Sequence, residues 1–408
     1  MAENPSEIAA AARLEEFFGR RVGDHLKDWR KRESFAMYAF GILGDGERKS
    51  AEPIAARACA DPEQTKRVHD KLLHFLARSV WNDRAVRLEA ARYAIEAVQK
   101  REAVTTWIVD DTGFLKQGTH SVGVQRQYSG SAGKIANCQI GVSLAVATQD
   151  EQIPVDFELY LPESWTEDRI RRKEARIPHD VTFKTKPQLA LEMIERAIHA
   201  GIPGDTLLAD SAYGDSSDFR NVVRAYGFDF AVGIKSSTSV VRLDDRDAPV
   251  GVRASVHDLA TRSTRKFRRI TWRQGTGHPL SSRFAFIRVK TLHDDGLELA
   301  DRNPLWLVTE WRDGEAAPGH FVLTTLPRRV SKKGIVRILK ERWRTERMYE
   351  DLKGELGLDH FEGRSFPGWH HHVSVVMCCY AFVVAERVRA FPPSAERTLA
   401  IGSVEVAA

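Results

Sequence analysis

At residue 104 the chain changes from helical periodicity to β-strand composition. Three strand-like runs come first, and helices then alternate with shorter strands. The three runs are VTTWIVDD (104–111), NCQIGVSLAVAT (137–148) and QIPVDFELYL (152–161). The alternating elements are a helix at 187–200, a strand at 205–210, a helix near 216–226 and a strand at 228–235. This order predicts an α/β fold, a mixed sheet with helices on its faces.

The segments on either side of this region divide the chain into further expected parts. Residues 1–100 read as helices near 6–20, 34–43, 51–60, 62–80 and 84–99. Asp61-Pro62 is a strong helix start, because Asp caps free amides and Pro tolerates the first turn. A helix-turn-helix-like DNA reader and a domain that merely packs both fit these short helices.

The 408 residues therefore divide into five expected parts. Residues 1–100 form a helical domain, and 101–235 form the first part of a catalytic core. Residues 236–330 hold several strand-like runs and no convincing helix, which predicts a β-rich insertion. Residues 331–392 supply the last helices of the core, and 393–408 a loosely ordered tail.

Composition and charge place the chain among soluble globular proteins. It has no basic-then-apolar leader and no apolar run near the ~20 residues of a membrane span, so we expect a cytoplasmic protein without a membrane partner. Four cysteines lack zinc-ligand spacing and read as free thiols. The net charge is only +5, but basic clusters at 169–176, 261–269 and 327–333 make a phosphate backbone a plausible partner.

Acidic residues close two of the apolar runs. The first strand is expected to end in Asp110-Asp111, and LLAD ends in Asp210. A single acid at such a place is usually a cap or a turn residue. Active-site residues also gather at strand ends, so two such acids indicate a site at one edge of the sheet.

A third acid lies in RWRTERMYEDLK (342–353). We expect a helix that begins after the N-cap Ser331 and runs to about 356, with Ile335, Ile338, Leu339 and Tyr349 on one apolar stripe. Arg342, Glu346 and Lys353 project from the same stripe, where a solvated helix would carry no charge. Glu346 is either part of an active site or paired with Arg342 one turn earlier.

If Asp110, Asp210 and Glu346 converge, their mutual repulsion requires a cation. Sites made only of carboxylate oxygens suit Mg²⁺ or Mn²⁺. Two such ions would stabilise the attacking and leaving oxygens of a phosphodiester. These residues therefore predict metal-dependent phosphoryl transfer, with Arg342 and Lys353 holding phosphates.

These residues give the chain a resemblance to bacterial insertion-sequence transposases of the DDE type, whose catalytic domain has a ribonuclease-H-like fold. Arg342, Glu346 and Lys353 match the spacing of that family's Tyr-Arg-Glu-Lys signature, with Leu339 at the Tyr position. The stretches around Asp110-Asp111-Thr112 and LLADSAYGD resemble the contexts of the family's two aspartates. Asp110 is the preferred first ligand, with Asp111 as the alternative.

The resemblance implies a transposase that cuts double-stranded DNA at terminal inverted repeats and joins the ends to target DNA. It implies a dimer on DNA, a nucleoid-associated location and two bound Mg²⁺ or Mn²⁺ ions. Trp272, in the insertion, becomes a candidate for stacking on a DNA base, although a buried core Trp is the commoner role. A silent DNA-binding relative and a nuclease without strand transfer remain open as alternatives. His370, His371 and His372 splay about 100° apart on a helix and cannot all ligate one ion.

Overall fold

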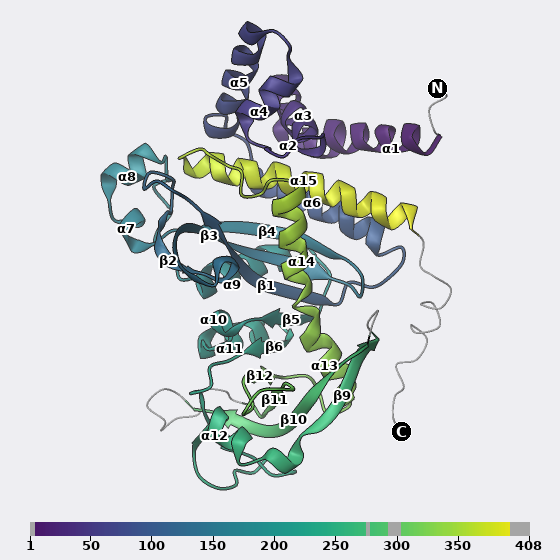
Figure 1. Cartoon of the computed structure of the whole chain (residues 1–408), viewed down its shortest axis with the longest axis vertical. Helices are drawn as coiled ribbons and strands as arrows, with labels where there is room; N and C mark the ends of the chain where they lie inside the picture. The colour runs from purple at the N-terminus through teal and green to yellow at the C-terminus, as the bar shows by residue number, and fades with distance from the viewer. Residues whose placement is uncertain (1–4, 275–277, 293–302, 392–408) are drawn as a thin grey trace.

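The computed structural model describes residues 5–274, 278–292 and 303–391. Helices from the N-terminal part lie at one end of the molecule, and a β-rich part lies at the other, with the central sheet between them (Figure 1). The expected mixed α/β architecture is confirmed, and it is consistent with a ribonuclease-H-like fold. The predicted tail at 393–408 lies outside the described residues.

The N-terminal part is helical, as predicted. Its elements are α1 (Pro5–Glu16), the π-helical η1 (Phe17–Val22), α2 (Gly23–Leu26), α3 (Trp29–Leu43), α4 (Ala51–Ala58), α5 (Pro62–Ala77) and α6 (Asp83–Val98). The expected cap at Asp61 is present, because its side chain accepts a hydrogen bond from the Glu63 amide and Pro62 opens the helix.

The core follows the predicted order, with one additional hairpin strand. Its strands are β1 (Thr106–Leu115), β2 (Gln125–Ser129), β3 (Lys134–Ala147), β4 (Gln152–Tyr160), β5 (Thr206–Ala209) and β6 (Asp229–Gly233). Its helices are η2 (Gly130–Ala132), α7 (Glu163–Thr166), α8 (Arg169–Glu174), α9 (Lys186–His199), α10 (Ser211–Gly214) and α11 (Ser217–Ala225). Strand β2 was missed because its residues are mostly exposed and lie in a Gly-rich stretch without an apolar pattern.

Strand β1 lies between β3, which is antiparallel to it, and β5, which is parallel to it. The expectation that the first strand ends at Asp110-Asp111 is wrong. The strand continues to Leu115 because β3 pairs with it as far as Cys138, well beyond the end of β5. The two acids therefore lie within a strand, at the point where one of its two neighbours stops.

The region 236–330 is β-rich, as predicted. It contains β7 (Ser239–Arg242), β8 (Ala254–Ser255), α12 (Val256–Thr261), η3 (Thr264–Lys266), β9 (Arg268–Gln274), β10 (Pro279–Thr291), β11 (Leu305–Trp311) and β12 (His320–Thr324). The short helix α12 was not expected, and it forms because Ser255 caps its first turn. Strand β12 pairs with β6 of the core, so the described strands form one sheet in the order β2-β3-β1-β5-β6-β12-β11-β10-β7-β8, with β4 on β3 and β9 on β10.

The predicted long helix after Ser331 is broken. Ser331 caps α13 (Lys332–Glu341), and after a turn at Arg342-Trp343 the chain resumes as α14 (Arg344–Glu350) and the π-helical η4 (Asp351–Glu355). Figure 1 shows α13 beside the β-rich part and α14 crossing the central sheet. No Gly or Pro marks this break in the sequence.

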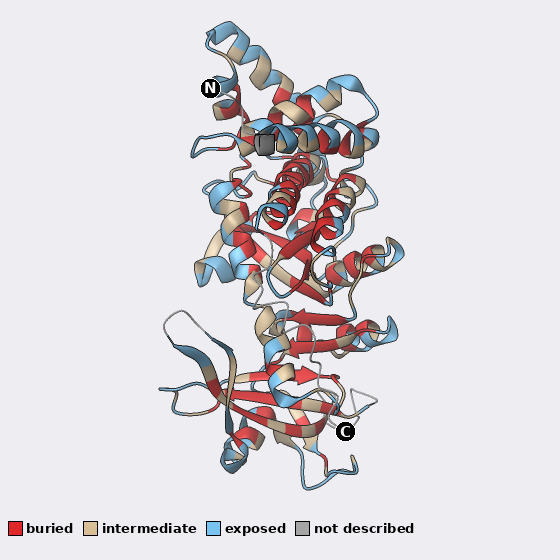
Figure 2. Cartoon of the chain, turned by 90° about the vertical axis from the view of Figure 1, so that its right-hand side faces the viewer, coloured by how far each residue is buried: buried red, intermediate tan, exposed pale blue. Residues whose placement is uncertain are grey.

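The last helix, α15 (Phe366–Ala390), lies between the N-terminal helices and the sheet (Figure 1). It is buried along most of its length, and the buried residues drawn in red run from this layer into the sheet (Figure 2). Cys378 and Cys379 are buried free thiols, as predicted. None of the described helices is long and apolar enough to cross a membrane.

Candidate active site

Asp110 and Asp210 follow the last paired residues of two neighbouring parallel strands. The pairing of β1 with β5 ends at Val109 and Ala209, so the two aspartates come next at the same level of the sheet. Side chains alternate between the faces of a strand. Asp110 therefore shares the face of Ile108, against which Ile338 and Leu339 of α13 pack, and Asp111 points to the opposite face.

The Asp110 carboxylate is paired with an arginine from the broken helix. Arg342 Nη1 donates to Asp110 Oδ2 at 3.0 Å. Burial raises the pKa of Asp110 to about 7; the negative charge of Asp210 adds to the rise and Arg342 opposes it. Burial also raises the pKa of Asp210. Two carboxyl groups thus lie close together in a largely desolvated place, where the charge of Asp210 opposes the ionisation of Asp110 and the charge of Asp111 opposes that of Asp210.

Asp111 has partners of its own on the opposite face. Lys186 Nζ, at the start of α9, lies 2.9 Å from Asp111 Oδ2, and the hydroxyl of the buried Tyr213 donates to the same oxygen at 3.3 Å. Tyr213 thus has a positioning contact. The geometry favours Asp110 over Asp111 as the partner of Asp210. Of the two, only Asp110 lies on the same face of the sheet as Asp210 and bonds Arg342.

A close approach of two glycines sets the position of Asp210. A Cβ on Gly214, at the end of α10, would lie 2.1 Å from the carbonyl oxygen of Gly233 in β6. Only glycine lets α10 sit this near to the strand. Asp210 caps this short helix, with Oδ1 accepting from the Ala212 amide at 2.9 Å.

The three charges expected on the apolar stripe have different surroundings. Arg342 contacts Asp110 and not the predicted Glu346. Lys353 Nζ donates to the Gly113 carbonyl of β1 at 2.8 Å and lies 5.3 Å from the centre of the Phe114 ring. Glu346 is exposed, so its expected place on the buried stripe is wrong. The break at Arg342-Trp343 changes the helical phase, which is why the sequence periodicity misplaced it.

The residues present can serve part of a divalent-metal site. Asp110 and Asp210 supply oxygen donors at the same end of two neighbouring strands, and burial, which raises the pKa of both carboxyl groups, disfavours their charged forms unless a cation is bound. Among the described residues, no group of three His, Cys, Asp or Glu lies close enough to hold a metal ion. The donor set fits Mg²⁺ or Mn²⁺ with two protein ligands, and Mg²⁺ commonly keeps water and substrate oxygens as the others.

Two tryptophans border this region, and the more exposed one was not predicted. Trp272, the expected base-stacking residue, is half-buried, with its ring edge-on to Phe284 at 6.0 Å and Lys340 Nζ 4.8 Å from its centre. Trp343, at the helix break, is 47% exposed, and Arg273 and Arg344 lie 5.9 and 5.7 Å from its ring. The sequence gives no sign of this exposure, because an unbroken helix would place the residue differently.

A buried hydroxyl pair supports the strand that carries Asp110. Tyr349 of α14 lies 2.6 Å from Ser143 Oγ, and Ser143 is the β3 residue directly opposite Asp110. Burial raises the pKa of Tyr349 well above its usual value, so this phenol stays protonated. Sequence analysis placed Tyr349 on the apolar stripe but had no means of finding its partner on β3.

The three consecutive histidines of α15 are buried and contact different segments. His370 lies 3.3 Å from Glu158 on β4, His371 bonds the Leu76 carbonyl at 2.7 Å, and His372 bonds the Tyr38 hydroxyl at 2.9 Å. Burial lowers the pKa values of His371 and His372 to about 4. The three side chains tie α15 to three different neighbouring segments.

Comparison with known proteins agrees with this arrangement. Residues 21–279 match the family described as DDE superfamily endonuclease, and residues 178–382 match the family described as transposase DDE domain. The chain is also similar to a probable transposase for insertion sequence element IS701 from Microchaete diplosiphon, with 28% identity over 211 residues. That alignment covers 52% of this chain and 50% of the relative, so the chain matches about half of the relative's length. The first family match spans more than half of the chain, and the protein therefore belongs to the DDE-type transposase family.

Proposed function

We propose that this protein is a transposase that cuts DNA at the ends of its element by metal-dependent phosphoryl transfer and joins those ends to target DNA. The observation that carries the proposal is the pair Asp110 and Asp210, side by side where the pairing of β1 with β5 ends, with Arg342 against Asp110. A bound Mg²⁺ or Mn²⁺, in one or two copies, would supply Lewis-acid stabilisation of the phosphodiester oxygens.

The side chains of the protein have separate tasks in this proposal. Asp110 and Asp210 would hold the metal, and Glu346 would join them as the third ligand in the complex with DNA. Arg342 is placed to bind a phosphate of the substrate when it leaves Asp110. Lys353 fixes β1 through Gly113 and adds positive charge to the same region.

The proposed substrate is double-stranded DNA carrying terminal inverted repeats, bound by a dimer in the cytoplasm. The exposed Trp343, more than the half-buried Trp272, is available to stack on a base. We infer that the helical N-terminal part contributes to holding this DNA.

The proposal is tested with a plasmid that carries the DNA flanking the gene on both sides. Asp110→Asn and Asp210→Asn should each lower Mg²⁺-dependent cleavage about 10³-fold or more, as expected when a ligand of the catalytic metal is lost. Asp111→Asn is the matched control, because it removes the neighbouring acid and its bond to Lys186. It should keep most of the activity.

Strand-transfer products from the wild type would separate a transposase from a nuclease. DNA binding without cleavage by the wild type would instead identify a silent DNA-binding protein. Cleavage by Asp110→Asn at the wild-type rate would remove the site from consideration.

A further inference from the structure

The segment between β4 and α9, residues 161–185, leaves the sheet at the edge that carries the catalytic pair. Strands β1 and β4 both run antiparallel to β3, and Tyr160 at the end of β4 is level with Gly113 of β1, three residues beyond Asp110. The segment returns at Lys186, which bonds Asp111. Both ends of the segment that carries α7 and α8 therefore lie at the same end of the sheet as the candidate active site.

This segment is held in shape by internal bonds. The guanidinium of Arg172 donates to four backbone carbonyls, those of Thr166, Pro178, His179 and Val181, at 2.6 to 3.3 Å. Asp168 caps α8 by accepting from two amides. These internal bonds fix the shape of the segment and so preorganise the surface that it presents.

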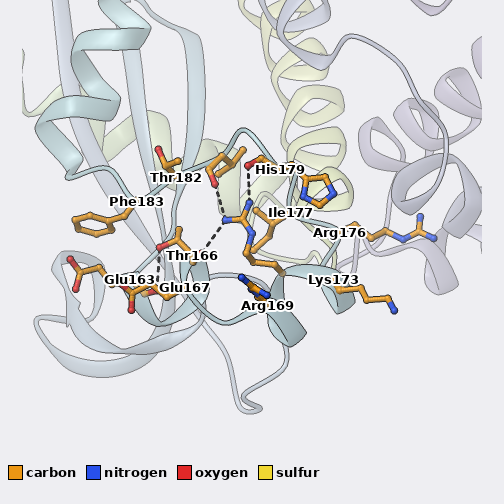
Figure 3. Close-up of a pocket in the computed structure, with 12 residues that line it drawn as sticks. Glu163, Thr166, Glu167, Arg169, Lys173, Arg176, Ile177, His179, Thr182 and Phe183 are labelled. Atoms are coloured by element: carbon orange, nitrogen blue, oxygen red, sulfur yellow. Dashed lines mark hydrogen bonds between the residues drawn. The ribbon is translucent and has the colours of Figure 1, made fainter.

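One side of this surface is a row of arginine and lysine side chains. Arg169 and Lys173 are one turn apart on α8, Arg176 follows the end of the helix, and all three are exposed. Figure 3 shows Lys173 and Arg176 extending away from Glu163 and Glu167, which lie at the other end of the cavity. An anionic backbone would thus follow the Lys173–Arg176 end.

Arg176 has a backbone conformation that a residue with a side chain rarely adopts. Its φ is +56°, and it closes α8 through the bond from the Ile177 amide to the Arg172 carbonyl. This is the position after a helix at which glycine is favoured. Because the strained backbone disfavours any side chain at this position, we take the arginine there as a sign that its guanidinium makes a functional contact.

The row of cationic side chains continues where this segment contacts the N-terminal helices. Arg176 lines both the cavity of about 1020 Å³ beside α8 and a second cavity of about 660 Å³ beside the loop between α5 and α6. Its guanidinium donates to the carbonyl of Ala77, the last residue of α5, at 3.0 Å. The exposed Arg78 follows directly, so the two parts of the protein bring arginines together here.

We propose that Arg78, Arg169, Lys173 and Arg176 bind successive phosphates of the double-stranded DNA that enters the catalytic edge. The inference rests on the proposed function and identifies where its substrate lies. Duplex DNA fits better than a single strand, because neither aromatic side chain of this segment is open for stacking: Trp165 is only 2% exposed and is covered by Arg171, and Phe183 is half-buried against the ring of Tyr160. The surface therefore offers cations for a backbone and no fully exposed ring for stacked bases.

The test is the salt dependence of binding to a fluorescein-labelled DNA duplex of about 30 base pairs, followed by anisotropy. The variant Lys173→Ala/Arg176→Gly removes two cations and gives the strained position its favoured residue, so the fold should persist. We expect roughly tenfold weaker binding near 0.1 M salt and a log–log salt slope that is smaller by about two.

Lys100→Ala is the matched control. Lys100 is also exposed, but it follows α6 and precedes β1, so it lies at the opposite end of this strand. Its removal should leave the salt slope of DNA binding within error. A double variant that unfolds at the wild-type temperature and keeps the wild-type slope would overturn the inference. Tight binding of single-stranded DNA that depends equally on both cations would overturn the assignment to duplex.

The same measurements separate this inference from the proposed function. If the wild type binds the duplex with the full slope but cuts no DNA, the transposase proposal fails and the surface remains. If it cuts DNA and the double variant behaves like Lys100→Ala, the surface fails and the transposase proposal remains. A wild type that binds no duplex would contradict both.

Discussion

The Asp110 carboxyl lies beside a second aspartate in a place from which water is largely excluded. Its pKa of about 7 is above the ordinary value of 3.8, chiefly because of burial. Between these two values the folded chain holds more of this proton than the unfolded chain does, so stability falls as the pH rises from about 4 to 7. Above pH 7 the full penalty is present.

We therefore expect Asp110→Asn to stabilise the metal-free protein while it abolishes cleavage. The gain in the free energy of unfolding should be close to zero near pH 4 and about 2–4 kcal/mol at pH 8, because the amide cannot ionise. Urea unfolding in EDTA at several pH values measures it. Asp111→Asn, which loses the bond to Lys186, should give no such gain. If the gain in the free energy of unfolding were the same at every pH, ionisation of Asp110 would not be its cause.

At this scale the sequence could identify the acids but could not choose between the first two. The apolar run before Asp110-Asp111 indicated a buried strand with acids attached. Which of the two shares a face with Asp210 depends on the register between β1 and β5, and no local pattern encodes that register. Lys186 and Ser143, which contact Asp111 and Tyr349, lie far from their partners in the sequence.

Among the elements, the α13–α14 pair has the largest consequence for the site. Periodicity predicted one helix, since the break at Arg342-Trp343 contains neither Gly nor Pro. The contact of Arg342 with Asp110 is tertiary, and the exposure of Glu346 follows from the change of phase at the break. Local sequence could therefore locate this helix and its cap at Ser331 but not its break.

This geometry predicts unequal roles for the acids in metal binding without DNA. Mn²⁺ should raise the melting temperature of the wild type, because it relieves the repulsion between Asp110 and Asp210. Asp210→Ala should lose this shift. Glu346→Ala should keep most of it, because Glu346 is exposed and apart from the pair. Thermal unfolding with and without Mn²⁺ measures the difference. Loss of the shift in Glu346→Ala would show that Glu346 already binds the metal in the absence of DNA.

A second group of elements meets at a buried ionic network. Arg87 of α6 is fully buried and bonds Asp156 of β4 at 2.9 Å, while Arg84 of the same helix is 55% exposed and bonds Glu158 at 3.0 Å. Arg87→Ala should lower the free energy of unfolding by about 3–5 kcal/mol, since it leaves buried carboxylates with too few cations. Arg84→Ala, the matched control, should lower it by about 1 kcal/mol or less. Equal losses would mean that burial of the pair does not decide its contribution.

At the scale of the whole molecule, the order of elements along the chain was predictable, but the tertiary contacts between them were not. Each predicted strand from 104 to 330 has a counterpart, because alternating apolar residues are a local signal. The pairing of β12 with β6 joins the β-rich insertion to the core sheet, and residues about 90 positions apart make that contact. Composition alone predicted the insertion and the core as separate parts, although this pairing joins their strands in one sheet.

The last helix links the other end of the chain in the same way. Helix α15 packs against α3, α5 and α6 as well as β4, and its buried side chains include all three histidines. Because residues from both ends of the sequence form this layer, the proposed boundary at residue 100 should not mark an independent folding unit. A fragment of residues 101–408 would expose one side of α15 to water and would lack the Leu76 carbonyl, so His371 Nδ1 would lose its hydrogen-bond partner.

We expect that fragment to aggregate or to unfold without a cooperative transition, and we expect co-expression of residues 1–100 to restore a soluble complex. Size-exclusion chromatography and calorimetry of the two preparations measure this. Arg13→Ala in the full chain is a control for the outer contact alone, because Arg13 bonds Glu386 of α15 at 2.8 Å on the partly exposed side. It should shift the melting temperature by only a few degrees, as one partly exposed ion pair is worth about 1 kcal/mol or less. A monomeric 101–408 fragment that melts cooperatively near the wild-type temperature would show that the N-terminal helices are a separable domain.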